Sequence, residues 1–196
     1  MAREPLKVLT ESMFYVLLSL LRQERCGTEI VQYVDDATAG RVPLGPGTLY
    51  TILAKFQEEG LIRETAVEGR KRTYAITDRG RALFRQELSR LRLCVGDGER
   101  EERAAEAWLE EKAAQGWILE KWGISARFER IAPCRCRVRL DPKDRRNRQQ
   151  QAEAETLYRD MGWRWNGTLW FYDVYYCFDT TAPDLYPDPE TQAWAW

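Results

Sequence analysis

The chain of 196 residues contains no histidine. Without imidazole it cannot use a histidine general base, a Ser-His-Asp triad or a histidine-ligated zinc ion. Its five cysteines are odd in number and irregularly spaced, which is typical of reduced thiols and not of a disulfide framework. We therefore expect no enzymatic activity, no metal and no cofactor.

Long apolar runs are also missing. No run approaches the roughly 18 residues that a membrane-spanning helix needs. The longest, Met13 to Leu21, is interrupted by Ser19 and lacks the cationic start and cleavage site of a signal peptide. The hydrophobic fraction of 44% and the balance of 30 basic and 31 acidic residues indicate a folded protein. We expect it to be cytoplasmic, with no membrane partner.

Tryptophan is absent from the first half of the chain, since all eight tryptophans lie from Trp108 onward. Charge is also uneven: residues 1–95 hold 15 basic and 12 acidic residues, and residues 96–196 hold 15 and 19. The two halves therefore predict two domains, residues 1–95 and 99–182, and Gly96-Asp97-Gly98 marks the break between them. A tail rich in proline and tryptophan follows at residues 183–196.

The stretch from Gly45 to Leu61 predicts an amphipathic helix. Pro46 suits its first position, Gly60 suits the left-handed residue after its end, and the opposite face is small and polar. Such a pattern alone is most often an ordinary surface helix. The apolar residues fall at helical spacing: Leu49, Ile52, Leu53 and Phe56.

The segments around this helix favour a DNA-binding domain. Two helices precede it, the first capped by Thr10 and ended by Cys26-Gly27, the second capped by Thr28. Two short strands, 62–67 and 72–76, follow it as a hairpin, and Thr77 caps a fourth helix that runs to about residue 94. Three helices and then a hairpin is the order of a winged helix-turn-helix domain, which is mainly α.

The residue types fit DNA recognition. A slim helix face at Gly47, Thr51 and Ala54 can enter the major groove, where hydroxyl and methyl groups meet base edges. Longer polar side chains can reach phosphates, and three consecutive cations at the hairpin tip can follow the backbone or minor groove. The candidate DNA contacts are Thr48, Tyr50, Thr51 and Lys55 on the helix and Arg70, Lys71 and Arg72 on the wing.

Residues from about Leu9 to Leu91 resemble the PadR family of transcriptional regulators. The resemblance is carried by GTEIVQYV, by GRVPLGPGTLYTILAKFQEEGLI and by EGRKRTYAITDRG. It implies a homodimer, usually a repressor, that binds double-stranded operator DNA through the helix and wing residues named above. One departure is Gly45, where family members commonly have serine; the missing side-chain cap costs a few tenths of a kcal/mol.

The second half predicts a different, α+β domain. A helix at 99–115 ends at Gly116-Trp117, and a helix at 145–161 ends at Gly162-Trp163. Extended segments follow the first helix at 117–122, 126–130 and 136–140, and the second at 164–165, 168–173 and 174–178. Two tandem α-β-β units would form a ferredoxin-like antiparallel sheet with both helices on one face.

Residues 100–190 also resemble a domain family of unknown function that occurs fused behind PadR-like winged helices. The shared features are WLEEKAAQGW, a later GW and LYPDPE. This resemblance implies no established activity.

The role of the aromatic residues in this domain stays open between two interpretations. One is a sheet-face pocket for a small aromatic or apolar effector. The other is a protein-interaction or dimerisation surface without a ligand. The candidate ligand contacts are Trp117, Trp122, Trp163, Trp165, Trp170 and Tyr172.

A third interpretation is a thiol sensor at Cys134 and Cys136, because the adjacent Arg135 and Arg137 would lower a thiol pKa if they approached it. The simpler explanation is two strand cysteines on one face.

Overall fold

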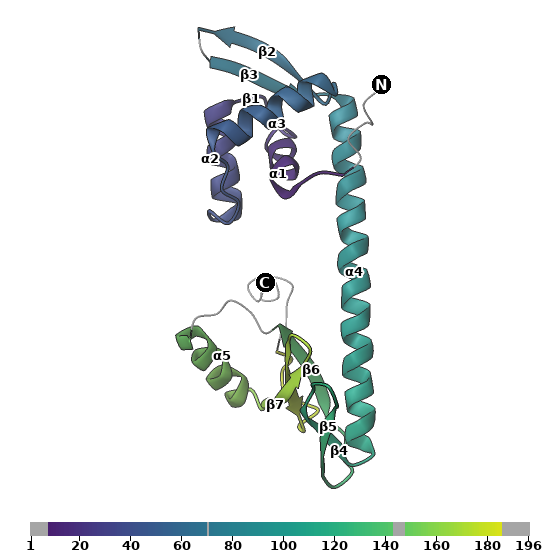
Figure 1. Cartoon of the computed structure of the whole chain (residues 1–196). Coiled ribbons are helices and arrows are strands. Elements are labelled where there is room, and N and C mark those ends of the chain that lie inside the picture. Colours follow the sequence, from purple (N-terminus) through teal and green to yellow (C-terminus); the bar gives the residue numbers. More distant parts are fainter. Residues whose placement is uncertain (1–7, 70, 143–147, 186–196) are drawn as a thin grey trace. The chain divides into compact units, whose positions relative to one another are not determined.

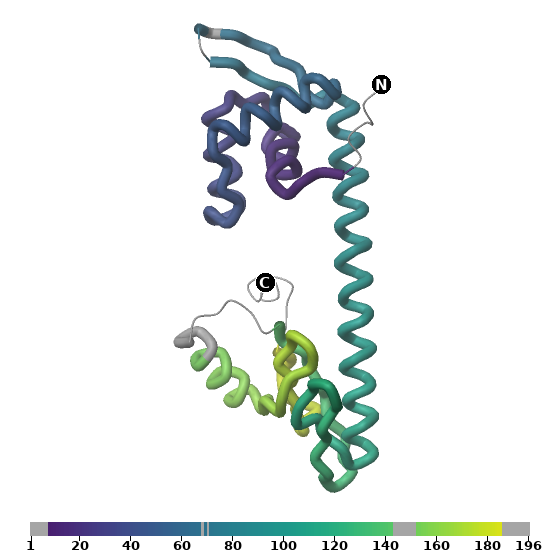
Figure 2. The backbone as a smooth tube through the Cα atoms, viewed as in Figure 1, coloured from purple at the N-terminus to yellow at the C-terminus, as the bar shows by residue number. Residues whose placement is uncertain are grey.

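The computed structural model of the chain describes residues 8–69, 71–142 and 148–185. The chain divides into two compact units, an N-terminal unit up to Val95 and a C-terminal unit from Gly96. Helix α4 (Asp78–Ala114) begins in the first unit and ends in the second (Figures 1 and 2). Each unit is described by itself below.

The N-terminal unit is a winged helix domain, as the sequence predicts. Its sheet is antiparallel with strand order β1-β3-β2, and β2 and β3 form the wing (Figure 1). Strand β1, which the sequence analysis missed, is two residues long and pairs with β3. In chain order the elements before α4 are α1 (Glu11–Ser19), β1 (Arg25–Cys26), α2 (Gly27–Thr38), α3 (Pro46–Glu58), β2 (Ile62–Glu68) and β3 (Lys71–Ile76).

Helix α3 lies where the sequence places it. Gly45 is its N-cap and makes no side-chain cap hydrogen bond, and Pro46 is its first residue. Gly60 follows its C-terminus with a φ of 66°, in the left-handed region that glycine adopts without strain. The predicted apolar face is buried in the core of the unit, with no residue more than 4% exposed: Leu49, Ile52, Leu53 and Phe56.

The predicted start of α2 is wrong. Thr28 was expected as its cap, but the N-cap is Cys26, whose backbone N–H donates to Glu29 Oε2 at 2.8 Å. The chain is already extended at Arg25 and Cys26 because both pair with β3, so the helix starts directly after this strand. By contrast, Thr10 caps α1 as predicted and accepts a hydrogen bond from the Met13 N–H.

The predicted end of the fourth helix near residue 94 is also wrong, because α4 continues through Gly96-Asp97-Gly98 to Ala114. Glycine inside a helix costs about 1 kcal/mol relative to alanine, which is too little to stop a helix whose flanks favour it. Those flanks are rich in glutamate, arginine and alanine. Ion pairs between Asp97 and Arg100 and between Glu99 and Arg103 add local support at helical spacing.

The C-terminal unit is α+β, as expected, but its strands form two antiparallel sheets and not one. The sheets are β4-β5 and β6-β8-β7. They meet where the Trp122 N–H donates to the Thr168 carbonyl and the Asn166 side chain donates to the Leu119 carbonyl. The tandem-repeat origin of the unit stays a prediction. After α4 the elements are β4 (Trp117–Lys121), β5 (Arg127–Arg130), β6 (Arg137–Pro142), α5 (Arg148–Asp160), β7 (Arg164–Leu169) and β8 (Tyr172–Cys177).

The two helices of this unit pack on opposite faces of the three-stranded sheet, contrary to the expectation of one shared face. Leu109 of α4 belongs to a buried cluster with Val174 and Tyr176, whereas Tyr158 of α5 belongs to a cluster with Tyr175. Neighbouring strand residues point to opposite faces. Strand β8 is therefore covered on both sides, which explains why all six of its residues are buried.

The strand boundaries near the end of the chain differ from the prediction. Extended segments were expected at 168–173 and 174–178, but the turn between β7 and β8 lies at Trp170 and Phe171. Trp170 has a φ of 53°, a left-handed conformation that is uncommon for residues other than glycine. No glycine or proline marks this turn, so turn chemistry could not reveal it.

Candidate nucleic-acid interface

The face of α3 opposite the core is open to solvent. Thr48, Tyr50 and Thr51 are exposed, and Lys55 is half-buried at the edge of this face. The Thr51 hydroxyl donates to the Gly47 carbonyl at 2.9 Å, which fixes its rotamer and leaves its oxygen free to accept a hydrogen bond. The four helix positions singled out from the sequence are therefore available on one side of α3.

Tyr50 connects α3 to α2. A Cβ added at Gly27, the first residue of α2, would lie 3.4 Å from Tyr50 Oη and 3.4 Å from Leu49 Cδ2. The phenol ring therefore lies over the N-terminus of α2 while remaining 56% exposed. This contact orients the Tyr50 hydroxyl without burying it.

The wing carries exposed cations that already have partners. Lys71 Nζ lies 3.8 Å from Glu29 Oε1, and Arg72 Nη1 lies 2.8 Å from Glu64 Oε2. Both cations are about half exposed, and exposed ion pairs contribute little to stability, so a phosphate can compete for either one. Arg70, the third predicted wing contact, lies outside the described residues.

Glu29 joins the wing to the start of α2. Its pKa is lowered, first by the hydrogen bond from the Cys26 backbone N–H and further by the positive charge of Lys71. The ionised carboxylate thus caps α2 and holds Lys71. Neither this role nor that of Glu64 was predicted: Glu29 and Lys71 lie far apart in the sequence, and Glu64 meets Arg72 across the two strands of the wing.

The six candidate ligand residues of the C-terminal unit do not gather on one sheet face. Trp163 and Tyr172 are buried in different clusters on opposite faces. Trp117 lies under the Arg130 guanidinium, 5.5 Å from it, and Trp165 is exposed and donates from Nε1 to a buried carboxylate. Of the six, only Trp122 and Trp170 form a ring contact with each other.

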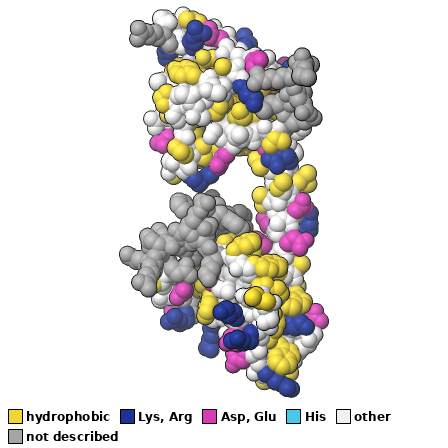
Figure 3. All heavy atoms as spheres, in the orientation of Figure 1, with side chains coloured by type: hydrophobic (Ala, Val, Ile, Leu, Met, Phe, Trp, Pro, Cys, Tyr) yellow, Lys and Arg dark blue, Asp and Glu magenta, His cyan; other side chains and the backbone are white. Residues whose placement is uncertain are grey.

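Trp122 and Trp170 belong to a partly exposed aromatic cluster. Trp108 of α4 contacts Trp122 at 6.3 Å between ring centroids and Phe128 of β5 at 5.8 Å, and Trp122 contacts Trp170 at 6.1 Å. All three contacts are edge-to-face, the geometry that the ring quadrupoles favour. Hydrophobic side chains are visible at the surface of this unit (Figure 3). Trp108 and Phe128 were not among the predicted residues.

Cys136 does not have the chemistry of an activated thiol. Cys136 is buried, and this burial raises its pKa to about 12. The condition for a lowered pKa, an arginine close to the thiol, is not met by Arg137, because its side chain reaches Cys177 Sγ and the carbonyl of Ala182. All five cysteines are free.

The described part of the chain contains no cluster of three or more histidine, cysteine or acidic residues that could hold a metal ion. Among its helices, none is long and apolar enough to cross a membrane.

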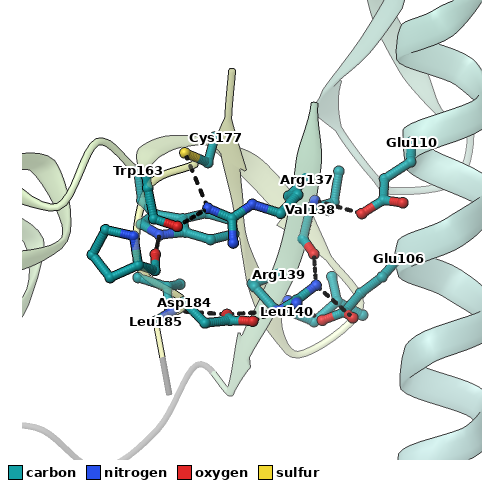
Figure 4. A network of polar contacts seen from close by, with 12 residues as sticks. Glu106, Glu110, Arg137, Val138, Arg139, Leu140, Trp163, Cys177, Asp184 and Leu185 are labelled. Atoms are coloured by element: carbon teal, nitrogen blue, oxygen red, sulfur yellow. Dashed lines mark hydrogen bonds and ion pairs between the residues drawn. The ribbon is translucent and has the colours of Figure 1, made fainter. Parts of the chain in front are cut away.

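A row of glutamates on α4, which the sequence analysis also missed, holds the end of this helix against the sheet. We call Glu102, Glu106 and Glu110 the glutamate row. The row accepts hydrogen bonds from Tyr172 Oη at 2.5 Å, from the Leu140 N–H at 3.0 Å and from the Val138 N–H at 2.9 Å. Figure 4 shows Glu106 and Glu110 reaching from the helix to β6. The four-residue spacing of these glutamates is visible in the sequence. Their hydrogen bonds to backbone N–H groups leave no pattern in the sequence, so they could not be predicted.

Arg139 of β6 binds the segment that follows β8. Arg139 donates from Nε and Nη2 to both oxygens of Asp184, at 2.9 and 2.6 Å (Figure 4). Burial opposes ionisation of Asp184, but these hydrogen bonds outweigh it and lower its pKa. Trp163 lies beneath the guanidinium groups of Arg137 and Arg139 and donates to the Pro183 carbonyl at 2.9 Å.

The fold and the exposed face of α3 define a winged helix protein of the nucleic-acid-binding type, and comparison with protein families agrees. Residues 16–86 match the transcriptional regulator PadR-like family. Residues 101–195 match a protein family of unknown function, DUF2812. The chain thus carries a PadR-like domain followed by a DUF2812 domain, as its motifs predict.

Solved structures are similar to part of the chain. A transcriptional regulator from Clostridium thermocellum is 23% identical, with 45% of this chain and 87% of that chain covered and a TM-score of 0.42. Bacillus subtilis PadR in complex with operator DNA is 24% identical, with 39% and 46% covered and a TM-score of 0.36. Pex from Synechococcus is 28% identical, with 44% and 87% covered and a TM-score of 0.33. No curated protein matches the chain.

Proposed function

We propose that this protein is a cytoplasmic transcriptional repressor that binds double-stranded operator DNA as a homodimer. One observation carries the proposal: the exposed hydroxyl-bearing face of α3 belongs to the same PadR-like domain as a wing with exposed cations. The match of residues 16–86 to the PadR-like family supports the proposal, because that family is one of transcriptional regulators.

Helix α3 is the proposed reading element. An α-helix fits the major groove, and short side chains let its backbone approach the base edges. Thr51 would meet base edges, while Thr48, Tyr50 and Lys55 would contact phosphates. The Tyr50 hydroxyl, placed over the start of α2, is suited to a phosphate contact because the N-terminus of a helix favours negative charge.

The wing is the proposed second contact. On binding, Lys71 and Arg72 would exchange the carboxylates of Glu29 and Glu64 for phosphate oxygens. Arg70 would act with them at the hairpin tip. This exchange makes wing binding sensitive to salt, since each phosphate contact releases counterions.

The modest charge of the DNA-binding domain supports dimerisation. Residues 1–95 have a net charge of +3, from 15 basic and 12 acidic residues. Non-specific attraction to DNA is therefore weak, and two domains on two half-sites would supply the missing affinity. Helix-turn-helix dimers place their recognition helices about 34 Å apart, one turn of B-DNA.

The test for operator binding is a footprint on the DNA upstream of the protein's own gene, because repressors often regulate themselves. We expect protection of two half-sites about 10 base pairs apart, centre to centre. A matched fragment of shuffled sequence is the control. Equal affinity for both fragments at physiological salt would reject the proposal.

For the C-terminal unit we propose that it senses a small aromatic or apolar effector. The supporting observation is the partly exposed cluster of Trp108, Trp122, Phe128 and Trp170, since exposed apolar clusters on folded domains mark binding surfaces. The same cluster would equally serve a protein partner or a second subunit, which is the alternative function.

Ligand titration separates these two functions. An effector that binds the cluster should quench tryptophan fluorescence, raise the melting temperature and weaken operator binding. Trp170→Ala should abolish all three effects, whereas Trp165→Ala, at an exposed tryptophan outside the cluster, should not. If no compound that raises the melting temperature changes operator affinity, the sensing role fails. A dimer that dissociates on Trp170→Ala would then favour the interaction module.

A further inference from the structure

The glutamate row replaces a missing neighbour strand. Strand β6 is the edge of the sheet β6-β8-β7, so its outward backbone groups have no strand partner among the residues that the structure describes. Glu106 and Glu110 accept the hydrogen bonds of Leu140 and Val138 on this edge. Unpaired backbone groups at a buried edge are costly, and helix α4 satisfies them with side chains.

Helix and strand geometry make this match possible. Four residues of an α-helix rise about 6 Å. Two residues of a strand rise about 6.6–6.8 Å. The step from Glu106 to Glu110 therefore matches the step from Leu140 to Val138, and the helix and the strand run in opposite directions along this contact.

The surroundings of Glu106 disfavour its ionised form. Burial, the largest cause, raises its pKa to about 7, although the Leu140 N–H and Arg139 favour the ionised form. The other charged groups that face it are Glu110 on α4 and Asp184 after β8, and both disfavour its ionisation. Arg139 is shared between Glu106 and Asp184, so it cannot fully neutralise either one.

We propose that Glu106 is a proton switch that sets how firmly helix α4 is held on the free edge of β6. When Glu106 is neutral, its carboxyl oxygen still accepts the Leu140 N–H, and Arg139 pairs with Asp184 alone. When Glu106 is ionised, a third carboxylate is confined beside Glu110 and Asp184, and Glu106 must share Arg139 with Asp184. The contact between α4 and β6 is then weaker.

The direction of the pH dependence follows from the raised pKa. An acid whose pKa is higher in the folded state binds its proton more tightly there, so its contribution to stability is complete below the unfolded pKa of 4.5 and is lost as the pH rises through about 7. Each pKa unit is a tenfold change, so the docking equilibrium weakens by at most about 300-fold across this window.

Two measurements on the full chain without DNA test the switch. The carbon resonance of the Glu106 carboxyl should titrate near pH 7. Hydrogen exchange at the Val138 and Leu140 amides, corrected for intrinsic rates, should become less protected between pH 5 and pH 8. Glu106→Gln keeps an acceptor for the Leu140 N–H without charge, so it should remove this pH dependence and keep the protection at pH 8.

Glu111→Gln is the matched control, because Glu111 lies on an exposed face of the same helix. This variant removes one negative charge from α4 and should retain the pH dependence of the parent chain. A carboxyl titration near pH 4.5 would overturn the proposal even if Glu106→Gln did not fold. An unchanged pH dependence in a folded Glu106→Gln variant would overturn it equally.

Discussion

Among the glycines of the N-terminal unit, Gly80 leaves the least room for a side chain. A Cβ added there would lie 2.1 Å from the Leu61 carbonyl oxygen and 2.8 Å from Ile76 Cγ1. Helix α4 begins here, and the Thr77 hydroxyl accepts the Gly80 N–H while donating to the chain at the end of α3. Glycine is therefore required for the close approach of α4 to the α3–β2 turn, not for an unusual backbone angle.

Gly80→Ala should destabilise the N-terminal unit. The added methyl group meets backbone that cannot retract without moving β2, and overpacking of this kind costs about 1–3 kcal/mol or more. Denaturant unfolding followed by circular dichroism measures the effect. Gly47→Ala is the matched control, because nothing lies within 4 Å of its new methyl group and alanine favours the helix. Equal stability of both variants would show that α4 does not approach Leu61 this closely.

Individual residues also show the limit of sequence reasoning about the site. Thr48, Tyr50 and Thr51 were predictable because helical spacing assigns each residue of α3 to a buried or an exposed face. The carboxylates that hold the wing cations were not. Glu29 meets Lys71 only after the hairpin has folded against α2, and Glu64 meets Arg72 only when the two strands of the hairpin pair.

Among the elements, α3 and the wing hairpin were predictable and β1 was not. Helix α3 has local start and stop signals in Pro46 and Gly60, and the hairpin has a glycine between two alternating runs. Strand β1 exists only because β3 pairs with it, and two residues cannot show a period. The packing of α4 and α5 on opposite faces of the sheet could not be predicted either. A strand buried on both faces lacks the alternation of apolar and polar residues, so its sequence does not show which face each helix covers.

Helix α4 is the element for which the local sequence pattern gave the least accurate prediction. Gly96 and Gly98 predict a break, yet no atom outside the helix backbone would meet a Cβ at Gly98. Since the helix is continuous, Gly98→Ala should raise its stability by up to about 1 kcal/mol. Helical content and the midpoint of thermal unfolding measure this gain. A loss of stability on Gly98→Ala would instead place a turn at residues 96–98.

At the scale of the whole molecule, the chain joins a domain whose role the sequence indicates to a domain whose role it does not indicate. The PadR-like domain has its helix face, its wing and its basic residues in the order of a DNA-binding domain. The sequence of the DUF2812 domain does not indicate a binding face in this way, because its aromatic residues belong to two buried clusters and one partly exposed cluster. Composition could show that this half was aromatic, but only the sheet topology shows which rings meet.

The salt dependence of DNA binding tests the central claim most directly. On an operator fragment, Lys55→Ala and Lys71→Ala should each weaken binding, and each should reduce the slope of log affinity against log salt by about one, as expected for a lost phosphate contact. Arg103→Ala, an exposed cation on the part of α4 in the C-terminal unit, should leave the slope unchanged. Equal slopes for all three variants and the parent chain would contradict recognition of DNA by α3 and the wing.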